Sequence, residues 1–378
     1  MKRSLLLLTA GFGEGHNAAA RALAQTWDER EGEGSAVIAD PFALAHPSAN
    51  GFLRRVYLAA INGSPWAWRA FYGWMDRSRL LPKVLGRLPG EGRVIDGLLE
   101  RHRPFAVVST FPGHNFTLHH LSRASRPVPP RFTVVTDSIS LNSLWWTGGS
   151  AAWFVPNEDS AAVLRTAGVP GAQIDVTGFP VPLAFARLGD ALAPPALSAG
   201  GRPRILVMIH SGRRGAEATA RLLLEERGWD LTFAVGREEG LRRRLTALAA
   251  GRAGVTVLGW TREIPQLLLT HHVVVSKAGG ATTQEALAAG CPMVVSQIVP
   301  GQEEGNYELL RRHGIGALAQ KPEVVRGVLR EAFADEGSLL GRWRAGVARL
   351  RRPLAATEIL TRVVERAGTE AVDTRGGR

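Results

Sequence analysis

The sequence predicts a two-domain α/β protein in which each domain is built on a doubly wound parallel sheet. Short apolar, strand-like runs alternate with helix-like stretches along both halves of the chain, a pattern typical of sheets covered by helices on both faces. Residues 191–203, ALAPPALSAGGRP, contain neither a strand pattern nor an amphipathic repeat and are the expected linker. With 378 residues, the chain is long enough for two domains that each bury a core.

The N-terminal domain is expected over residues 1–190 and opens with a buried strand. This first strand could be mistaken for a signal peptide, but its apolar run is too short and passes into a glycine-rich turn. No stretch of the chain reaches the eighteen or so apolar residues of a membrane-spanning helix. The expected elements are strands at 4–9, 36–40, 106–110, 132–136 and 152–155, helices at 18–29 and 157–167, and a mostly helical region up to about residue 102.

The C-terminal domain is expected over residues 204–350 and repeats the alternation. Its expected strands are 204–209, 230–235, 255–258, 273–276 and 292–296, and its expected helices are 216–227, 242–250, 264–269 and 282–289. Residues 351–367 are expected to form a C-terminal helix that packs back on the N-terminal domain. Residues 368–378, GTEAVDTRGGR, have the composition of a disordered tail.

A net charge of +12 points to an anionic partner or to a genome that favours arginine. Residues 51–103 hold ten Lys or Arg against four Asp or Glu, interleaved with aromatic side chains. That mixture suits the headgroup region of an anionic membrane, and the alternative is an aromatic core helix with a solvated basic face. The candidate membrane residues are Arg54, Arg55, Trp66, Trp68, Arg69, Phe71 and Trp74. No nucleic acid is expected, because no recognised binding motif accompanies the charge.

The stretch Ser276–Leu310 predicts a nucleotide-sugar site. A β-branched run ends at Lys277, and Gly279 and Gly280 precede a helix, so free N–H groups and the helix dipole suit a phosphate there. Glu285, one turn later, suits a ribose hydroxyl. The alternative is a tight strand-to-helix connection of the kind found in many α/β proteins.

Two residues in the N-terminal half are candidates for acid–base chemistry. His16 ends the glycine-rich turn Gly11–Gly15 at the start of a helix, whose dipole would keep the imidazole neutral and able to act as a base. The alternative is a helix-capping histidine. Asp137 follows a predicted strand and is either the base itself or the group that orients His16; the alternative is a turn aspartate.

The series Gly279-Gly280, Glu285-Ala286-Leu287, Gly290-Cys291-Pro292, Gly301-Gln302-Glu303 and Asn306 resembles the donor half of the diacylglycerol glycosyltransferases. This family comprises monogalactosyldiacylglycerol synthases and processive diacylglycerol glucosyltransferases, and it is similar to the peptidoglycan lipid-intermediate N-acetylglucosaminyltransferase. The resemblance implies a GT-B fold, with two Rossmann-like domains facing across a cleft. It also implies inverting transfer of a hexose, glucose or galactose, from a UDP-sugar to diacylglycerol or a similar lipid.

The resemblance also implies roles for individual residues. The implied donor-binding residues are Gly15, Ser211, Gly212, Arg213, Trp260, Lys277, Gly279, Gly280, Thr282, Glu285, Gln302, Glu303 and Asn306. Phe111 and His114 lie in a segment that looks like the family's acceptor-side loop. Asn142 stands where family members commonly carry a histidine, so the role of that histidine does not carry over.

Neither a metal nor another cofactor is expected, because the sequence has no Asp-x-Asp motif and its adjacent histidine pairs lack helical metal-site spacing. The single cysteine, Cys291, fits a reducing cytoplasm and an ordinary packing role. We therefore expect a cytoplasmic protein at the inner face of the cell membrane. The alternatives are transfer to a polyprenyl-linked or other hydrophobic acceptor, a UDP-sugar-binding or epimerase-like protein, and a basic nucleic-acid-binding protein.

Overall fold

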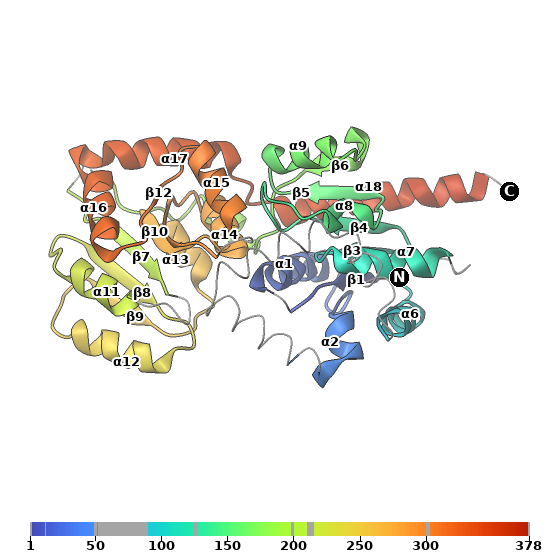
Figure 1. The fold of residues 1–378 in the computed structure, drawn as a ribbon, viewed down its shortest axis with the longest axis horizontal. Coiled ribbons are helices and arrows are strands. Elements are labelled where there is room, and N and C mark those ends of the chain that lie inside the picture. Colours follow the sequence, from blue (N-terminus) through green and yellow to red (C-terminus); the bar gives the residue numbers. More distant parts are fainter. Residues whose placement is uncertain are drawn as a thin grey trace. The chain divides into compact units, whose positions relative to one another are not determined.

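The computed structural model describes residues 2–11, 13–48, 51, 90–123, 128–197, 200–209, 215–299 and 303–376. The chain divides into two compact units, each a parallel sheet with helices packed on it (Figure 1). The first unit contains Met1–Leu183, Pro300–Gly305 and Leu354–Arg378, and the second contains Ala184–Val299 and Asn306–Pro353. The two doubly wound α/β sheets expected from the sequence are therefore present.

The sheet of the first unit has six parallel strands in the order β2-β1-β3-β4-β5-β6. The strands are β1 (Leu5–Leu8), β2 (Ala36–Ala39), β3 (Ala106–Ser109), β4 (Arg131–Val134), β5 (Ala152–Val155) and β6 (Ile174–Val176). The chain passes from β1 to β2 on one side and then crosses to β3 on the other side of β1. The carboxyl ends of β1 and β3 thus flank a topological switch point, the usual ligand position in an open parallel sheet.

Helices cover both faces of this first sheet. They are α1 (Glu14–Glu31), α2 (Pro41–Ala45), α6 (Glu91–His102), α7 (Gly113–Arg123), α8 (Leu144–Thr147), α9 (Glu158–Thr166) and α18 (Ala355–Gly376), with a 3₁₀ turn, η1 (Gly171–Gln173). On one face α1 and α18 share a core with alternate residues of β1 and β3. On the other face α6 and α7 contribute Ile95 and Leu118 to a second cluster with Leu6 and Leu8.

Helix α18 brings a late part of the chain onto the first sheet. Its buried side chains, Ala356, Ile359, Leu360, Val363 and Ala367, join the core cluster that contains Leu5 and Leu7. The helix runs on to Gly376, so residues 368–376, expected to be disordered, are helical. Once a helix has been nucleated and packed, each further residue that joins it orders only its own backbone and adds a hydrogen bond. The composition of residues 368–376 does not show that they continue such a helix.

The sheet of the second unit also has six parallel strands, in the order β12-β11-β10-β7-β8-β9. They are β7 (Arg204–Met208), β8 (Asp230–Ala234), β9 (Val255–Leu258), β10 (Val273–Lys277), β11 (Met293–Gln297) and β12 (Ala317–Leu318). The chain runs from β7 to β8 and β9 on one side and then returns to β10 on the other side of β7. Its switch point therefore lies between β7 and β10.

The helices between Ala184 and Leu350 complete this second layer structure. They are α10 (Ala184–Leu188), α11 (Ala216–Leu224), α12 (Glu239–Leu248), α13 (Ile264–Thr270), α14 (Gly280–Ala289), α15 (Glu304–Arg312), α16 (Pro322–Phe333) and α17 (Ser338–Leu350), with a 3₁₀ turn, η3 (Asp335–Gly337).

Cys291, between α14 and β11, is buried, and burial raises the pKa of its thiol to about 12. The thiol is therefore protonated and serves packing.

The division between the units differs from the expected linker. It falls between Leu183 and Ala184, and residues 191–203 belong to the second unit. Leu197 packs against the core of that unit, and the His272 ring donates from Nε2 to the carbonyl of Pro195 over 2.8 Å. Local composition predicted a loop here, but it does not reveal which core a loop packs on.

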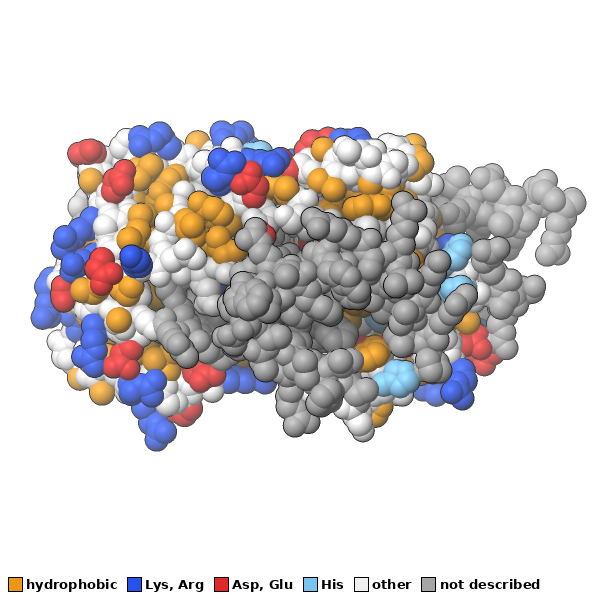
Figure 2. Space-filling view, viewed as in Figure 1, with side chains coloured by type: hydrophobic (Ala, Val, Ile, Leu, Met, Phe, Trp, Pro, Cys, Tyr) orange, Lys and Arg blue, Asp and Glu red, His pale blue; other side chains and the backbone are white. Residues whose placement is uncertain are grey.

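Several arginines of the second unit form ion pairs with nearby carboxylates. On the face shown in Figure 2, blue and red side chains lie next to one another over this unit. The ion pairs include Arg221 and Arg244 with Glu217, Arg242 with Glu239, Arg311 and Arg312 with Glu308, Arg326 with Glu225, and Arg330 with Glu226. These exposed pairs contribute about 0–1 kcal/mol each to stability.

Candidate functional site

His16 lies in the first turn of α1, at the switch point between β1 and β3. Its Nδ1 is 2.7 Å from the carbonyl oxygen of Thr110, which follows β3, and 2.8 Å from Oγ1 of Thr136. A carbonyl can only accept, so Nδ1 carries the proton and donates it to Thr110. In the neutral ring, Nε2 is then the atom with a free lone pair, as a general base requires.

The surroundings of His16 favour its neutral form. Burial lowers the pKa of the imidazole below its usual value of 6.5, and the neighbouring Asp137 carboxylate opposes that shift. The same burial raises the pKa of Asp137 above 3.8, with His16 opposing. Both side chains keep intermediate solvent exposure, so a substrate hydroxyl can reach them although their charged forms are desolvated. The dipole of α1, whose N-terminus carries His16, also lowers the pKa of the imidazole.

The lowered pKa of His16 predicts the acid limb of the pH profile. If the neutral imidazole is the base, kcat/KM falls only when the ring is protonated, so the acid limb should lie below pH 6.5. The measurement is kcat/KM for sugar transfer between about pH 4.5 and 9, a range that extends about two pH units to either side of the ordinary imidazole pKa. An acid limb above pH 6.5 would contradict this assignment, and a His16→Gln variant should lose the limb.

Asp137 is fixed by a tryptophan that the sequence did not connect with it. The indole Nε1 of Trp145 donates to Oδ2 of Asp137 over 2.9 Å, and Trp145 is almost completely buried. The ring of Trp145 also lies 6.1 Å from that of His16, centroid to centroid. Asp137 and His16 are thus neighbours, and whether Asp137 is the base or orients His16 stays a prediction.

Asn142, which stands in the place of the family's histidine, has a local structural role. Its Oδ1 accepts from the N–H of Leu144 at the start of α8, and the side chain is buried. Ile139 in the same turn has φ of 57°, the left-handed region that a β-branched residue rarely adopts. The turn after Asp137 therefore holds backbone strain, a property common beside functional sites.

The two acceptor-loop residues, Phe111 and His114, differ in their contacts and exposure. The Phe111 ring packs edge-on against His16, with centroids 5.3 Å apart. His114 is only 1% exposed, so its ring is not available to an acceptor, and its assignment to the acceptor surface is corrected. Its position at the start of α7 turns the ring inward, toward the carbonyl of Thr9.

In the second unit, α14 begins directly after Gly279, where the sequence predicts a phosphate-binding helix N-terminus. The first intrahelical bond runs from the N–H of Thr283 to the carbonyl of Gly279, so the N–H groups of the preceding three residues have no intrahelical acceptor. The Nδ2 of Asn306 donates to the carbonyl of Ala278 over 3.0 Å. Its buried Oδ1 has no hydrogen-bond partner within the described part of the chain.

The other donor-site residues occupy several positions. Lys277 ends β10 at a register shift in its pairing with β11, and Thr282 and Glu285 lie on α14 with low and intermediate exposure. Trp260 is 58% exposed, with the guanidinium of Arg262 5.6 Å from its ring centroid, so it is not a core residue. Glu303 is buried and is grouped with the first unit, whereas Asn306 is grouped with the second.

Some candidates lie outside the described residues. These are Arg54, Arg55, Trp66, Trp68, Arg69, Phe71 and Trp74 on the acceptor side, and Ser211, Gly212, Arg213 and Gln302 on the donor side. Gly15 is described, and a Cβ there would meet no described protein atom within 4 Å. Among the described residues, no three His, Cys, Asp or Glu side chains converge to hold a metal ion. No described helix is long and apolar enough to cross a membrane.

Glu285 gives a direct test of the donor assignment. Glu285→Ala is expected to weaken UDP binding about 10-fold, because a charge-assisted hydrogen bond to a ribose hydroxyl is lost. Isothermal titration calorimetry with UDP measures the change, and Glu323→Ala, an exposed carboxylate on α16, is the matched control. Equal UDP affinity in the two variants would remove Glu285 from the site.

Sequence reasoning missed the groups that hold the two candidate catalytic side chains. Thr110 contributes a main-chain carbonyl, which leaves no signal in a sequence, and Thr136 contributes a hydroxyl next to Asp137. Trp145 lies eight residues after Asp137, and that spacing does not reveal the hydrogen bond between them. The parallel order of β1, β3 and β4 brings these groups together.

Solved structures with the same architecture define the class of the fold. Over 96% of this chain, it superposes on 99% of MurG from Acinetobacter baumannii with a TM-score of 0.59 and 13% identity. It also superposes, with 12% identity and a TM-score of 0.53, on UDP-GlcNAc 2-epimerase from Neisseria meningitidis, covering 96% of this chain and 100% of that one. Together with the two six-stranded parallel sheets, these likenesses establish a two-domain α/β fold of the GT-B type.

Sequence comparison identifies the relatives within that class. Residues 16–181 match the monogalactosyldiacylglycerol (MGDG) synthase family model. A processive diacylglycerol beta-glucosyltransferase from Staphylococcus carnosus is 26% identical over 343 residues, which cover 89% of this chain and 86% of that protein. The resemblance inferred from the sequence is confirmed: the chain is similar to the diacylglycerol glycosyltransferases over most of its length.

Proposed function

We propose that this protein transfers a hexose from a UDP-sugar to diacylglycerol or a similar membrane lipid and inverts the anomeric centre. The observation that carries the proposal is the state of His16. Its Nδ1 proton is committed to the Thr110 carbonyl, and burial keeps the ring neutral, so Nε2 is a base at the ligand edge of a sheet. The named activity of its relatives, transfer of glucose to diacylglycerol, supports the choice of acceptor.

The proposed reaction needs one proton transfer and one displacement. Nε2 of His16 takes the proton of the acceptor hydroxyl while that oxygen forms a bond to C1 of the sugar. The bond between C1 and the UDP oxygen breaks, its electron pair leaves with UDP, and the new glycosidic bond has the opposite configuration. Asp137 lies close enough to stabilise the resulting imidazolium, because its charge acts to raise the pKa of His16.

The leaving diphosphate needs positive potential. The unpaired N–H groups at the start of α14 supply it through the helix dipole, and Lys277 adds a cation next to that helix end. We propose that these groups take the place of a metal ion, so that the reaction proceeds in EDTA. Trp260, exposed after β9, offers a flat apolar face for the uracil ring.

The decisive test supplies both substrates. Purified protein is mixed with diacylglycerol vesicles and radiolabelled UDP-glucose or UDP-galactose, and the lipids are separated by thin-layer chromatography. A labelled glycolipid is expected, with equal yield in EDTA. The absence of glycolipid with both donors would overturn the proposal, and conversion of a free UDP-sugar to its epimer without lipid would favour the epimerase alternative. Transfer to a polyprenyl phosphate only would assign the other acceptor class.

We further propose that the protein acts at the cytoplasmic face of an anionic membrane, which it contacts through the basic and aromatic residues between Gly51 and Arg103. Charge reversal of Arg54, Arg55 and Arg69 should weaken binding, since each cation near an anionic surface contributes about 1 kcal/mol. Sedimentation with vesicles of phosphatidylglycerol and phosphatidylcholine measures the change. Reversal of Arg221, Arg326 and Arg330, which are ion-paired in the second unit, is the control and should leave binding nearly unchanged.

A further inference from the structure

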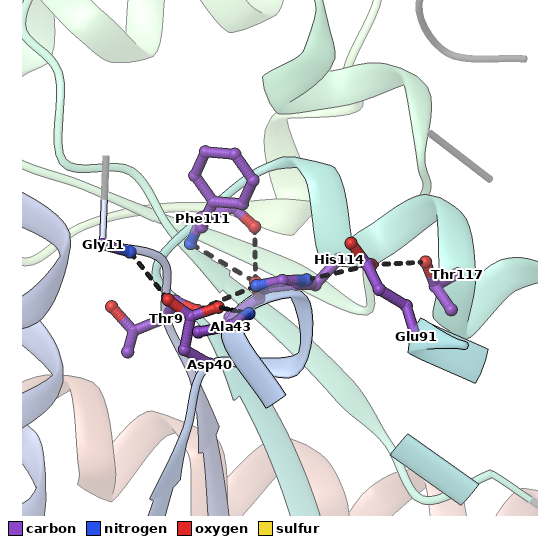
Figure 3. A network of polar contacts seen from close by, with 9 residues as sticks. Thr9, Gly11, Asp40, Ala43, Glu91, Phe111, His114 and Thr117 are labelled. Atoms are coloured by element: carbon purple, nitrogen blue, oxygen red, sulfur yellow. Dashed lines mark hydrogen bonds and ion pairs between the residues drawn. The ribbon is translucent and has the colours of Figure 1, made fainter. Parts of the chain in front are cut away.

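The first unit buries a histidine and a glutamate that the proposed chemistry does not use. Glu91, the first residue of α6, is 5% exposed, and His114, near the start of α7, is 1% exposed. Figure 3 shows the two side chains facing each other, with Nδ1 of His114 3.6 Å from Oε2 of Glu91. Thr117 donates from its hydroxyl to the same carboxylate oxygen over 3.3 Å. A buried carboxylate with so few partners is costly, which calls for a function.

The other nitrogen of His114 holds the end of β1. Nε2 lies 2.9 Å from the carbonyl oxygen of Thr9, and because a carbonyl only accepts, Nε2 carries a proton and donates it. Glu91 faces Nδ1 on the opposite side of the ring, at 3.6 Å and without a hydrogen bond among the described residues. When Nδ1 also carries a proton, the imidazolium and the carboxylate form an ion pair that orients the ring. Thr9 is the residue after β1, where the chain enters the glycine-rich turn that leads to His16.

The same turn is held on its other side as well. The hydroxyl of Thr9 donates to Oδ1 of Asn17 in the first turn of α1, and the N–H of Gly11 donates to Oδ2 of Asp40 over 2.8 Å. Glycine-rich turns have few steric preferences of their own, so these bonds, together with the bond from His114, determine where α1 starts. The position of His16 depends on that start.

A second connection runs through an aromatic ring. Phe111 packs edge-on against His114, with centroids 5.2 Å apart, as it does against His16. The residue before it, Thr110, provides the carbonyl that holds Nδ1 of His16. His114 therefore contacts both segments that fix the His16 ring, namely the end of β1 and the residues that follow β3.

We propose that Glu91 and His114 are positioning residues for His16: Glu91 orients the His114 ring, and His114 anchors the Thr9 carbonyl and the Phe111 ring so that Nε2 of His16 points toward the acceptor. The kinetic effect expected of this positioning rests on the proposed function, because it is measured as sugar transfer. Its structural part, the orientation of His16, does not depend on which acceptor is used.

The kinetic test compares an apolar with a hydrogen-bonding replacement. His114→Leu is expected to lower kcat about 10- to 100-fold, because small misplacements of a reacting group have effects of that size, with KM for the UDP-sugar unchanged. His114→Gln, which keeps a donor for Thr9, should restore most of kcat, and Glu91→Gln should fall between them. Leu118→Ala, buried on the same helix α7 outside this contact network, is the control for general loss of stability.

A double substitution separates positioning from folding. If His114 acts through His16, His114→Leu should change the residual kcat of a His16→Ala enzyme by less than about twofold, the non-additivity expected of residues that act as one unit. A loss of the original size in that background would overturn the proposal. So would unchanged kcat in His114→Leu, or losses in His114→Leu and Leu118→Ala that simply follow their melting temperatures.

One measurement needs no activity and keeps this inference distinct from the proposed function. The Nδ1–H proton of His16, bonded to the Thr110 carbonyl, should give a resolved signal in ¹⁵N-edited NMR spectra, assigned by its loss in His16→Ala. We expect that signal to shift or broaden in His114→Leu and to stay in place in Leu118→Ala. An unmoved signal in His114→Leu would overturn the positioning role, whereas failure of the wild-type protein to glycosylate lipid would overturn only the proposed function.

Discussion

Replacing His16 with alanine is expected to lower kcat for lipid glycosylation about 10²- to 10⁴-fold, the usual loss when a general base is removed. The imidazole is the group that the structure prepares for this role, since Thr110 fixes its tautomer and burial lowers its pKa. UDP affinity should stay near the wild-type value, because the groups assigned to the diphosphate and the ribose lie at the end of β10 and on α14. Single-turnover glycosylation and calorimetry with UDP measure the two quantities.

The control for this substitution is His120→Ala, which removes an exposed histidine from α7 and should be silent. Near-normal turnover in His16→Ala would leave Asp137 as the base. In that case Asp137→Asn should lose activity far more severely than His16→Ala. If His16 is the base, Asp137→Asn should retain more activity than His16→Ala, because the carboxylate only stabilises the imidazolium.

The second large effect concerns stability and is expected at α18. Ile359 is completely buried between α18 and the first sheet, so Ile359→Asp places an unpaired charge in that core. The free energy of unfolding of the first unit should fall by about 4 kcal/mol or more, which combines the loss of a large aliphatic side chain with the burial of a charge. Urea denaturation followed by circular dichroism measures the change.

Thr361→Asp introduces the same charge at an exposed position of α18 and should change stability little. Limited proteolysis then locates the damage: in Ile359→Asp, cleavage should begin within Met1–Leu183, while fragments from the second unit persist. Equal resistance of the two variants would show that α18 contributes little to the first core.

The strands of the two sheets were predictable because buried parallel strands consist of continuous runs of apolar residues. Leu5–Leu8 and the valines of Val273–Lys277 have this character, and glycines mark the turns that follow them. The order of the strands was not predictable in the same way, because a run of valines does not encode its neighbours. The two switch points, and with them the meeting of His16 with Thr110, follow from that order.

The candidate site was predictable where a residue type has a distinctive chemistry at a strand end, as for His16 and Asp137. The site was not predictable where a side chain is positioned by a chemical group that occurs throughout the chain. The carbonyl of Thr110 resembles every other carbonyl, and the contact between His114 and Glu91 joins two helices whose packing the sequence does not state. From the sequence alone, His114 is therefore assigned to an acceptor surface, although it is buried.

The packing of α18 on the first sheet has a consequence for biosynthesis. A ribosome releases β1 and α1 long before α18, so the part of this sheet face that α18 covers stays exposed while the whole second unit is being translated. The second unit, made from a nearly continuous stretch of chain, can complete its core earlier. The part synthesised first is therefore the part finished last, and its leucine-rich face is the surface that a nascent-chain chaperone would have to shield.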